Sequence, residues 1–207
     1  MIISIEGNIG TGKSTIIELL RDIFSHRTDI AFISEPVNEW QTLIDNDDNQ
    51  NILEKFYRDP KRWSYSFQMN AFITRAKQIL TSKKEIIIME RSILTDSKIF
   101  AAILREEGSI SDIEWKLHAN WFEWLKDSFR IVPDHYIYLK ADPEVSHSRM
   151  CSRNRNEEAT VPLDYLRKIS IKHDEWLENA DYCKIINANE ICDSYIQSVR
   201  SHIETIV

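Results

Sequence analysis

The sequence has few of the residues that cross-link or interrupt a chain. Its 207 residues include four glycines, five prolines and three cysteines. The cysteines (Cys151, Cys183 and Cys192) are odd in number and lack C-x-x-C spacing, which argues against a disulfide framework and against a structural zinc site. We therefore expect reduced thiols, as in a cytoplasmic protein.

Long apolar runs and an excess of positive charge are also missing. The apolar runs are short, Ile86–Met89 being an example, whereas a membrane-spanning helix needs about 20 apolar residues, so we expect no membrane span and no membrane partner. There are 26 lysines and arginines against 33 aspartates and glutamates, a net charge of −7. We expect no partner among polymeric nucleic acids, which favour basic surfaces, although a few local cations could hold a nucleotide. The first residues lead straight into a motif and leave no room for a targeting peptide, so we expect a cytoplasmic protein, or one whose targeting segment is not part of this sequence.

Short aliphatic runs alternate with longer helical stretches. The expected strands are 2–5, 30–34, 85–90, 135–140 and 183–186. The expected helices are 13–25, 62–82, 95–107, 111–128, 143–153, 162–178 and 190–206. This alternation predicts an α/β fold, a doubly wound, five-stranded parallel sheet flanked by helices. Because no linker divides the chain, we expect a single domain over residues 1–207.

Three of the four glycines lie within residues 7–12. The run G-N-I-G-T-G-K-S at 7–14 matches the phosphate-binding pattern G-x-x-x-x-G-K-[ST] and lies between an expected strand and an expected helix, as the motif requires. Glycines let backbone amides face phosphate oxygens, Lys13 would contact the β- and γ-phosphates, and the Ser14 hydroxyl would ligate Mg²⁺. The expected binding segment for ATP or GTP is Gly7, Asn8, Ile9, Gly10, Thr11, Gly12, Lys13, Ser14 and Thr15.

This motif alone does not separate a kinase from a GTPase or a motor. The chain has no N-K-x-D motif for reading guanine, which weakens the GTPase interpretation. Glu35 follows the second expected strand, where ligands of a doubly wound sheet gather, and it could accept a proton from an attacking hydroxyl. The alternative is a solvated loop glutamate. Trp40 favours the first interpretation, because a flat substrate would pack against it.

Five motifs, in order along the chain, resemble those of the deoxynucleoside kinase family. They are the glycine segment at 7–14, E-P-V-N-E-W at 35–40, F-Y-R-D-P with W and F-Q at 56–68, E-R-S at 90–92, and the arginines with E-E at 149–158. The resemblance covers about residues 2–178. It implies a P-loop nucleoside kinase with a lid at about 149–160, which transfers the γ-phosphate of ATP, bound with Mg²⁺, to the 5′-hydroxyl of a deoxyribonucleoside in nucleotide salvage.

The resemblance implies three roles around the transferred phosphate. Glu35 resembles the general base for the 5′-hydroxyl. Arg91 resembles the arginine beside it, which could keep Glu35 ionised and stabilise charge on the phosphoryl group. Glu90 resembles the acid associated with Mg²⁺. The alternative for Glu90 is a strand-end charge that pairs with a neighbour.

Other matches concern the sugar and the phosphates. Tyr57 and Glu158 resemble the pair that binds the 3′-hydroxyl, although Tyr57 alone would fit a core position. Arg149, Arg153 and Arg155 resemble the lid arginines, which would close over the phosphates and exclude water. The alternative for the arginines is a solvated basic face.

Base recognition is expected from residues on two later helices. Gln68 resembles the family's base-reading amide, while Arg75 and Asp96 match the deoxycytidine and purine-type enzymes. Because an ionised Asp96 only accepts hydrogen bonds and Arg75 only donates them, thymine would set a carbonyl against Asp96. We therefore expect deoxycytidine or purine deoxynucleosides over thymidine; the alternative is a structural Arg75–Asp96 ion pair. Trp40 and Phe100 would sandwich the base, although Phe100 equally fits a core position.

The expected helix 111–128 carries a broad apolar arc. It includes Ile113, Leu117, Trp121, Trp124 and Leu125. The resemblance implies a homodimer through this region, whereas a buried central helix in a monomer is the alternative. Two rival functions remain: a nucleoside-monophosphate kinase, although Glu35 would repel an acceptor phosphate, and a non-catalytic nucleotide-binding regulator.

Overall fold

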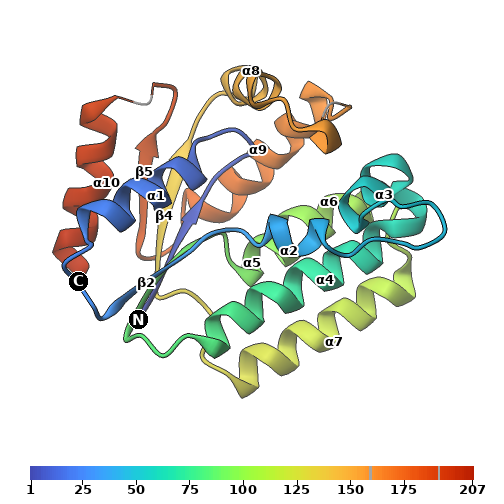
Figure 1. The fold of residues 1–207 in the computed structure, drawn as a ribbon, viewed down its shortest axis with the longest axis horizontal. Coiled ribbons are helices and arrows are strands. Elements are labelled where there is room, and N and C mark those ends of the chain that lie inside the picture. The colour runs from blue at the N-terminus through green and yellow to red at the C-terminus, as the bar shows by residue number, and fades with distance from the viewer. Residues whose placement is uncertain (159, 191) are drawn as a thin grey trace.

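A parallel β-sheet forms the centre of the molecule (Figure 1). The computed structural model describes residues 1–158, 160–190 and 192–207. Within these residues the sheet has five strands in the order β2-β3-β1-β4-β5. The strands are β1 (Ile2–Glu6), β2 (Ile30–Ile33), β3 (Ile86–Glu90), β4 (His135–Lys140) and β5 (Cys183–Asn187). The predicted α/β fold and all five predicted strands are confirmed, with ends that differ by one residue at most.

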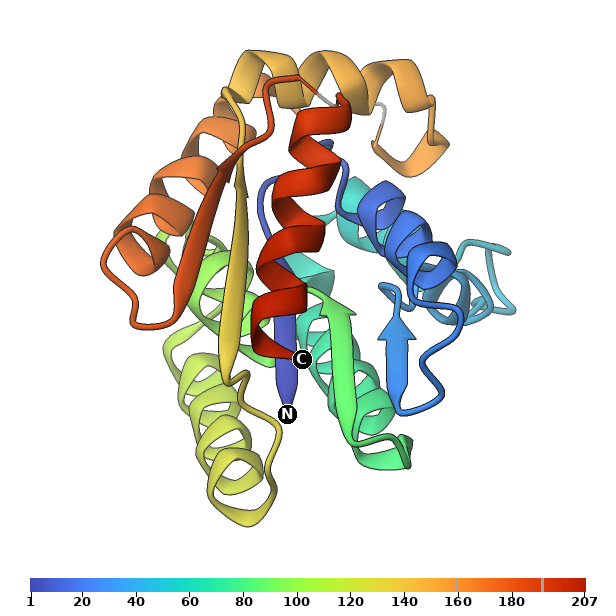
Figure 2. The same cartoon turned by 90° about the vertical axis from the view of Figure 1, so that its left-hand side faces the viewer.

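Helices cover both faces of this sheet, as Figures 1 and 2 show together. Helices α1 (Lys13–Ile23) and α10 (Asp193–Ile206) pack on one face. Helices α4 (Pro60–Thr81), α7 (Asp112–Ser128) and α9 (Leu163–Leu177) pack on the other. The result is a three-layer arrangement in which the central strands β1 and β3 are buried on both sides, which explains their largely aliphatic sequences.

The first strand shows how alternate residues serve the two faces. Ile3 and Ile5 pack with α1 and α10, whereas Ile2 packs with α4 and α7. Ser4 and Glu6 share the face of Ile2 because side chains alternate along a strand. All five residues of β1 are buried, so Glu6 is a carboxylate within the core.

Three helical features differ from the prediction. The helix predicted at 95–107 is interrupted: a π-helix (Asp96–Ala101) lies between α5 (Ile93–Thr95) and α6 (Ala102–Glu106). The prediction missed α2 (Val37–Gln41) and α3 (Ile52–Arg58), which are too short to show a helical period.

Helix α8 (Pro143–Arg153) is confirmed. Residues 159 and 191, within the predicted lid and the predicted last helix, lie outside the described residues.

The loops at the carboxyl edge of the sheet are gathered under α8. The P-loop connects β1 to α1, and the short 3-10 helix Asn156–Glu158 follows α8. Among the described residues, no helix combines the length and the apolar character needed to cross a membrane.

Gly10 marks the closest approach of α8 to the P-loop. Its φ is +82°, and a Cβ atom there would overlap the carbonyl oxygen of Ser146 in α8. Gly108 offers a matched control, since its φ is +74° and a Cβ there would meet no atom within 4 Å. Both positions carry the left-handed backbone, so only the steric overlap distinguishes them.

We expect Gly10→Ala to destabilise the protein more than Gly108→Ala. The control should lower the free energy of unfolding by about 1–2 kcal/mol, the cost of a left-handed alanine. Gly10→Ala should lower the free energy of unfolding by about 1–3 kcal/mol more than the control, because α8 must move to accept the added methyl group. Urea denaturation of both variants measures the difference, and equal losses would contradict the packing of α8 on the P-loop.

Candidate active site

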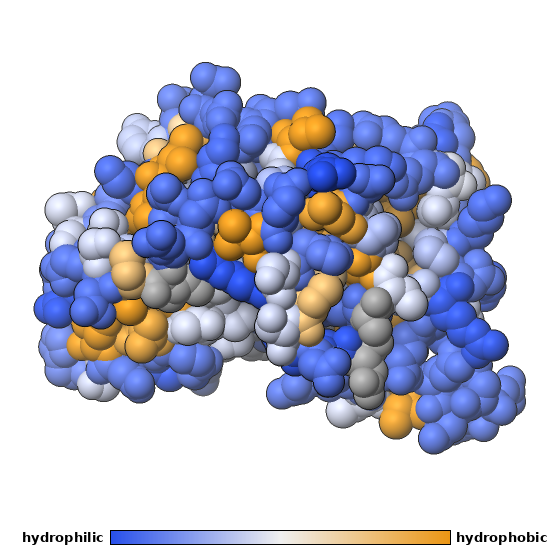
Figure 3. Space-filling model, turned by 90° about the horizontal axis from the view of Figure 1, so that it is seen from above, coloured by the Kyte–Doolittle hydropathy of each residue, from blue (hydrophilic) through white to orange (hydrophobic). Residues whose placement is uncertain are grey.

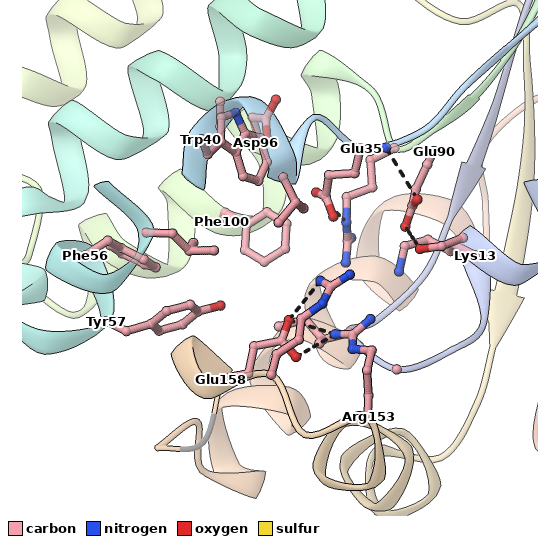
Figure 4. Close-up of a pocket in the computed structure, with 18 of the residues that line it drawn as sticks. Lys13, Glu35, Trp40, Phe56, Tyr57, Glu90, Asp96, Phe100, Arg153 and Glu158 are labelled. Carbon is pink, nitrogen blue, oxygen red and sulfur yellow. Dashed lines mark hydrogen bonds and ion pairs between the residues drawn. The ribbon is translucent and has the colours of Figure 1, made fainter. Parts of the chain in front are cut away.

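A cavity of about 530 Å³ opens at the carboxyl edge of the sheet. Figure 4 shows Phe56 and Tyr57 toward one end of it, Lys13 and Glu90 toward the other, and Glu35 between them. Nineteen of the predicted site residues line this cavity: Ile9, Gly10, Gly12, Lys13, Ser14, Thr15, Glu35, Trp40, Tyr57, Gln68, Arg75, Glu90, Arg91, Asp96, Phe100, Arg149, Arg153, Arg155 and Glu158.

Three residues of the predicted phosphate-binding segment do not line the cavity: Gly7, Asn8 and Thr11. The Asn8 amide donates to the Leu166 carbonyl and to the Ser170 hydroxyl of α9, both at 2.7 Å. The Thr11 hydroxyl donates to the Asn8 carbonyl at 3.0 Å. These side chains therefore brace the loop, and phosphate binding by their backbone stays a prediction.

Lys13 lies buried at the base of the P-loop. Its Nζ donates to the Asn8 carbonyl at 2.6 Å. Burial and, to a lesser extent, the charge of Arg91 lower the pKa of Lys13 to about 7, although Glu90 and Glu35 oppose the shift. A phosphate group beside this amine would supply the negative charge that favours its protonated form.

The predicted Mg²⁺ residues are in contact. The Ser14 hydroxyl donates to Glu90 Oε1 at 3.0 Å, and the backbone amide of Glu35 lies 3.4 Å from Glu90 Oε2. Mg²⁺ prefers oxygen ligands and is commonly held by one or two carboxylates together with substrate phosphates. This pair fits that mode, because the described residues contain no cluster of three or more acidic, histidine or cysteine side chains that could hold a metal alone.

Glu35 extends from the end of β2 toward three cations. Its Oε1 accepts a hydrogen bond from Arg75 at 2.9 Å and lies 3.4 Å from Arg91 Nε. Burial alone would raise the pKa of Glu35, but Arg91, Arg75 and Lys13 together hold it at about 2. Glu35 is therefore ionised at neutral pH and able to accept a proton.

Arg75 is 1% exposed and connects several parts of the site. Its guanidinium donates to both carboxylate oxygens of Asp96, at 2.8 and 3.2 Å, and to the Glu90 carbonyl at 3.2 Å. The Arg75–Asp96 ion pair that the sequence left open is present, and it extends to Glu35. Burial raises the pKa of Asp96 to about 6, although Arg75 opposes that shift.

Aromatic side chains form the other end of the cavity. Trp40 packs edge-on against Phe67 at 5.2 Å between ring centroids, and Phe56 stacks on Phe67 at 4.7 Å. The sequence did not single out Phe56 and Phe67 as site residues, although both lie in the motif at 56–68. Gln68 is 2% exposed, and its Oε1 has no hydrogen-bond partner among the described residues.

The end of α8 and the segment that follows it line one side of the cavity. Arg153 donates to both carboxylate oxygens of Glu158, at 2.7 and 2.6 Å, and Arg155 lies 3.4 Å from the same group. Glu157 instead accepts a hydrogen bond from Gln41, so Glu158 is the glutamate that faces the cavity. Hydrophilic side chains predominate on this side of the molecule (Figure 3).

Comparison with known proteins assigns this site to a family. The sequence pattern of the family described as "Deoxynucleoside kinase" matches residues 3–207. The chain belongs to the deoxynucleoside kinase family. It is 41% identical to a probable deoxycytidine kinase of fowlpox virus (strain NVSL), over 87% of this chain and 73% of that one. It is 35% identical to the deoxycytidine kinase of Homo sapiens (84% and 74% covered) and 36% identical to the mitochondrial deoxyguanosine kinase of Xenopus laevis (84% and 72%).

Family membership confirms the resemblance drawn from the five motifs. It makes the chain an ATP-dependent phosphotransferase whose substrates are small molecules, a nucleoside and ATP. The monophosphate-kinase and regulator alternatives are therefore not favoured. The roles of individual residues stay predictions.

We expect Lys13 to take up a proton when this kinase binds a nucleotide. With a pKa of about 7 in the free protein, Lys13 is mostly neutral at pH 8 and mostly charged at pH 6. Phosphates favour the charged form, so ADP affinity should fall as pH rises above 7. Calorimetric titration with ADP and Mg²⁺, in buffers of different ionisation enthalpy, should show uptake approaching one proton at pH 8 and little at pH 6. Uptake at pH 8 that persists in Lys13→Met would contradict this assignment.

Proposed function

We propose that this kinase phosphorylates the 5′-hydroxyl of a deoxyribonucleoside in nucleotide salvage. The observation that carries the proposal is the placement of an ionised Glu35 between the P-loop lysine and the aromatic end of one cavity. A primary alcohol at Glu35 would face the donor phosphate, while a sugar and base would extend toward Trp40 and Phe56. A second negative group on the acceptor would be repelled by Glu35, which favours a nucleoside over a monophosphate.

The proposed chemistry divides between a proton acceptor and a set of cations. Glu35 takes the proton of the 5′-hydroxyl as the oxygen attacks the γ-phosphorus of ATP, and ADP leaves. Arg91 orients Glu35 and stabilises the charge on the transferring group, as Lys13 does from the P-loop. Mg²⁺, held by Ser14 and Glu90 with the donor phosphates, would neutralise phosphate charge.

The lid would complete the phosphate site. Arg149, Arg153 and Arg155 line the cavity, and their guanidinium groups suit phosphate oxygens. Arg153 and Arg155 are now paired with Glu158, the residue proposed to bind the 3′-hydroxyl together with Tyr57. Donor phosphates would draw the arginines away and leave the Glu158 carboxylate available to the sugar.

The base would lie near Gln68, Arg75 and Asp96, between Trp40 and Phe100. The unpartnered Gln68 oxygen is an acceptor within the cavity, which suits an exocyclic amino group. An ionised Asp96 suits one as well, whereas thymine would present a carbonyl at a cost of about 1–3 kcal/mol. The relatives named as deoxycytidine and deoxyguanosine kinases support deoxycytidine or a purine deoxynucleoside over thymidine.

We also propose that two copies associate through α7 and α4. On α7, the side chains of Ile113, Leu117, Trp121 and Trp124 are 42–64% exposed, and Ile73 and Leu80 of α4 are about half exposed. The neighbouring Leu125 is buried against the sheet, which is why the predicted arc spans two faces of one helix. An apolar surface of this kind marks an interaction site more often than a free surface.

The proposal also includes a single domain over residues 1–207, with a lid at about 149–160. It further includes a cytoplasmic location. The three cysteines are free, as expected in a reducing compartment. Two separate transitions in calorimetric unfolding would contradict the single domain, and cell fractionation tests the location.

We expect Glu35→Gln to lower kcat by about 10²–10⁴-fold, because the amide cannot accept the hydroxyl proton. The assay measures ADP release with each of the four deoxynucleosides and cytidine. Deoxycytidine or a purine deoxynucleoside should be the best substrate and thymidine a weak one. Glu39→Gln, on α2, is the matched control and should stay within about twofold, since its ion pair with Lys77 is exposed. Full activity of Glu35→Gln would remove its role, and a strong thymidine preference would remove that of Asp96.

We expect Trp124→Glu to convert a homodimer into a monomer. The side chain is 52% exposed within one chain, so a glutamate there should leave the fold intact. Ile171→Glu on α9, at a position that is 56% exposed, is the control and should remain dimeric. Light scattering coupled to gel filtration measures the mass, and a wild-type mass of one 24.4 kDa chain would contradict the proposal.

A further inference from the structure

A buried carboxylate outside the proposed chemistry lies directly beneath the P-loop. Glu6, the last residue of β1, is fully buried and has no ion-pair partner among the described residues. Its Oε1 accepts hydrogen bonds from Ser4 at 2.6 Å and from Ser92 at 2.9 Å. Its Oε2 accepts one from Thr95 at 2.6 Å. A carboxylate with this burial is costly unless its hydrogen bonds are made, and here three hydroxyls make them.

Two of the three hydroxyls belong to the turn that follows β3. Ser92 directly precedes the short helix α5, and Thr95 is the last residue of that helix. The backbone amide of Ser92 donates to the Thr95 hydroxyl at 3.0 Å. Arg91 has a φ of +62°, a left-handed backbone that costs a non-glycine residue about 1–3 kcal/mol and persists only where the surroundings impose it. Glu6 is thus hydrogen-bonded to the residues that follow this strained position.

The strained backbone sets the direction of the Arg91 side chain. Its NH1 donates to the Gly7 carbonyl at 2.9 Å, and its Nε lies 3.4 Å from Glu35 Oε1. The guanidinium also lies 4.9 Å from the centre of the Phe100 ring. A change in the backbone angle at Arg91 would move this group away from Glu35.

A carboxylate holds the turn more firmly than a neutral side chain would. Each hydroxyl can donate or accept, and here all three donate to the carboxylate oxygens of Glu6. Because Thr95 Oγ1 donates to Glu6, its lone pair can accept the hydrogen bond from the Ser92 backbone amide. The contact of Thr95 with Glu6 and its contact with Ser92 are therefore fixed together. An amide at position 6 would present a donor to one of these hydroxyls and allow the opposite arrangement.

We propose that Glu6 is a positioning residue for phosphoryl transfer, because it fixes the left-handed turn from which Arg91 faces Glu35. The inference rests on the proposed function. The competing interpretation is that the hydrogen bonds of Glu6 link β1 to β3 and stabilise the sheet, with no effect on the reaction. The two interpretations differ in which of the hydroxyl contacts matter for turnover.

Ser4 and Ser92 provide a matched pair of substitutions. Both hydroxyls donate to the same oxygen of Glu6, but Ser4 lies on β1 itself and Ser92 lies on the turn. Ser4→Ala and Ser92→Ala should lower Tm by similar amounts. Ser92→Ala should lower kcat about tenfold, with the KM for ATP unchanged, whereas Ser4→Ala should stay within about twofold of wild type.

The pH profile supplies a second readout. If Arg91 turns away, Glu35 loses one of the three cations that lower its pKa and, among the described residues, keeps Arg75 of α4 and Lys13 of the P-loop. The acid limb of kcat should therefore move to higher pH in Ser92→Ala and in Glu6→Gln. Ser4→Ala should keep the wild-type limb. Thr95→Val, which also releases the turn, should reproduce the Ser92→Ala result if that variant folds poorly.

The outcomes separate this inference from the proposed function. If the wild type is active and Ser4→Ala and Ser92→Ala have equal kcat and pH profiles, the positioning role of Glu6 is overturned and only a structural role remains. The proposed function is then unaffected. A wild type that phosphorylates no nucleoside would overturn the proposed function, and the positioning role with it. A selective loss in Ser92→Ala and Glu6→Gln would support the positioning role.

Discussion

The structure of the site depends on the burial of opposite charges against one another. Three cations and three carboxylates surround the middle of the cavity: Lys13, Arg75, Arg91, Glu35, Glu90 and Asp96. Each would be costly to bury alone, and removing one partner of a buried pair is more damaging than replacing both, because it leaves an uncompensated charge. The cluster therefore depends on all of its members, and its cations hold the pKa of Glu35 low although burial alone would raise it.

Several polar groups of the site are paired with one another. Lys13 donates to the Asn8 carbonyl, and Glu158 accepts from Arg153. In the proposed reaction the donor phosphates and the sugar hydroxyls replace these internal partners. Each substrate then competes with a protein contact, so binding depends on the difference between the two sets of interactions. Such an exchange would favour movement of the proposed lid when phosphates bind.

Local sequence predicted the parts of the fold that local physics determines. The strands were predicted from their aliphatic runs, and the P-loop from its glycines and Lys13. The π-helix at Asp96–Ala101 was not, because its wide turn lies between helical segments and has no period of its own. The contact of Asn8 with Leu166 was out of reach because it joins residues 158 positions apart. The proposed role of Glu6 was equally hidden, since two of its three hydrogen-bond partners, Ser92 and Thr95, follow β3 in the chain.

Arg75 shows why a residue assigned to one task can serve two. Its position on α4 suggested base reading through Asp96, and the structure adds a hydrogen bond to Glu35, 40 residues earlier in the chain. One guanidinium has a limited number of donors, so a base that engages Arg75 would change how firmly it holds Glu35. The fit of the base and the position of the proton acceptor are then linked through a single buried side chain. A substitution of Arg75 that widened base selection would also remove a cation from Glu35, and selectivity and turnover would change together.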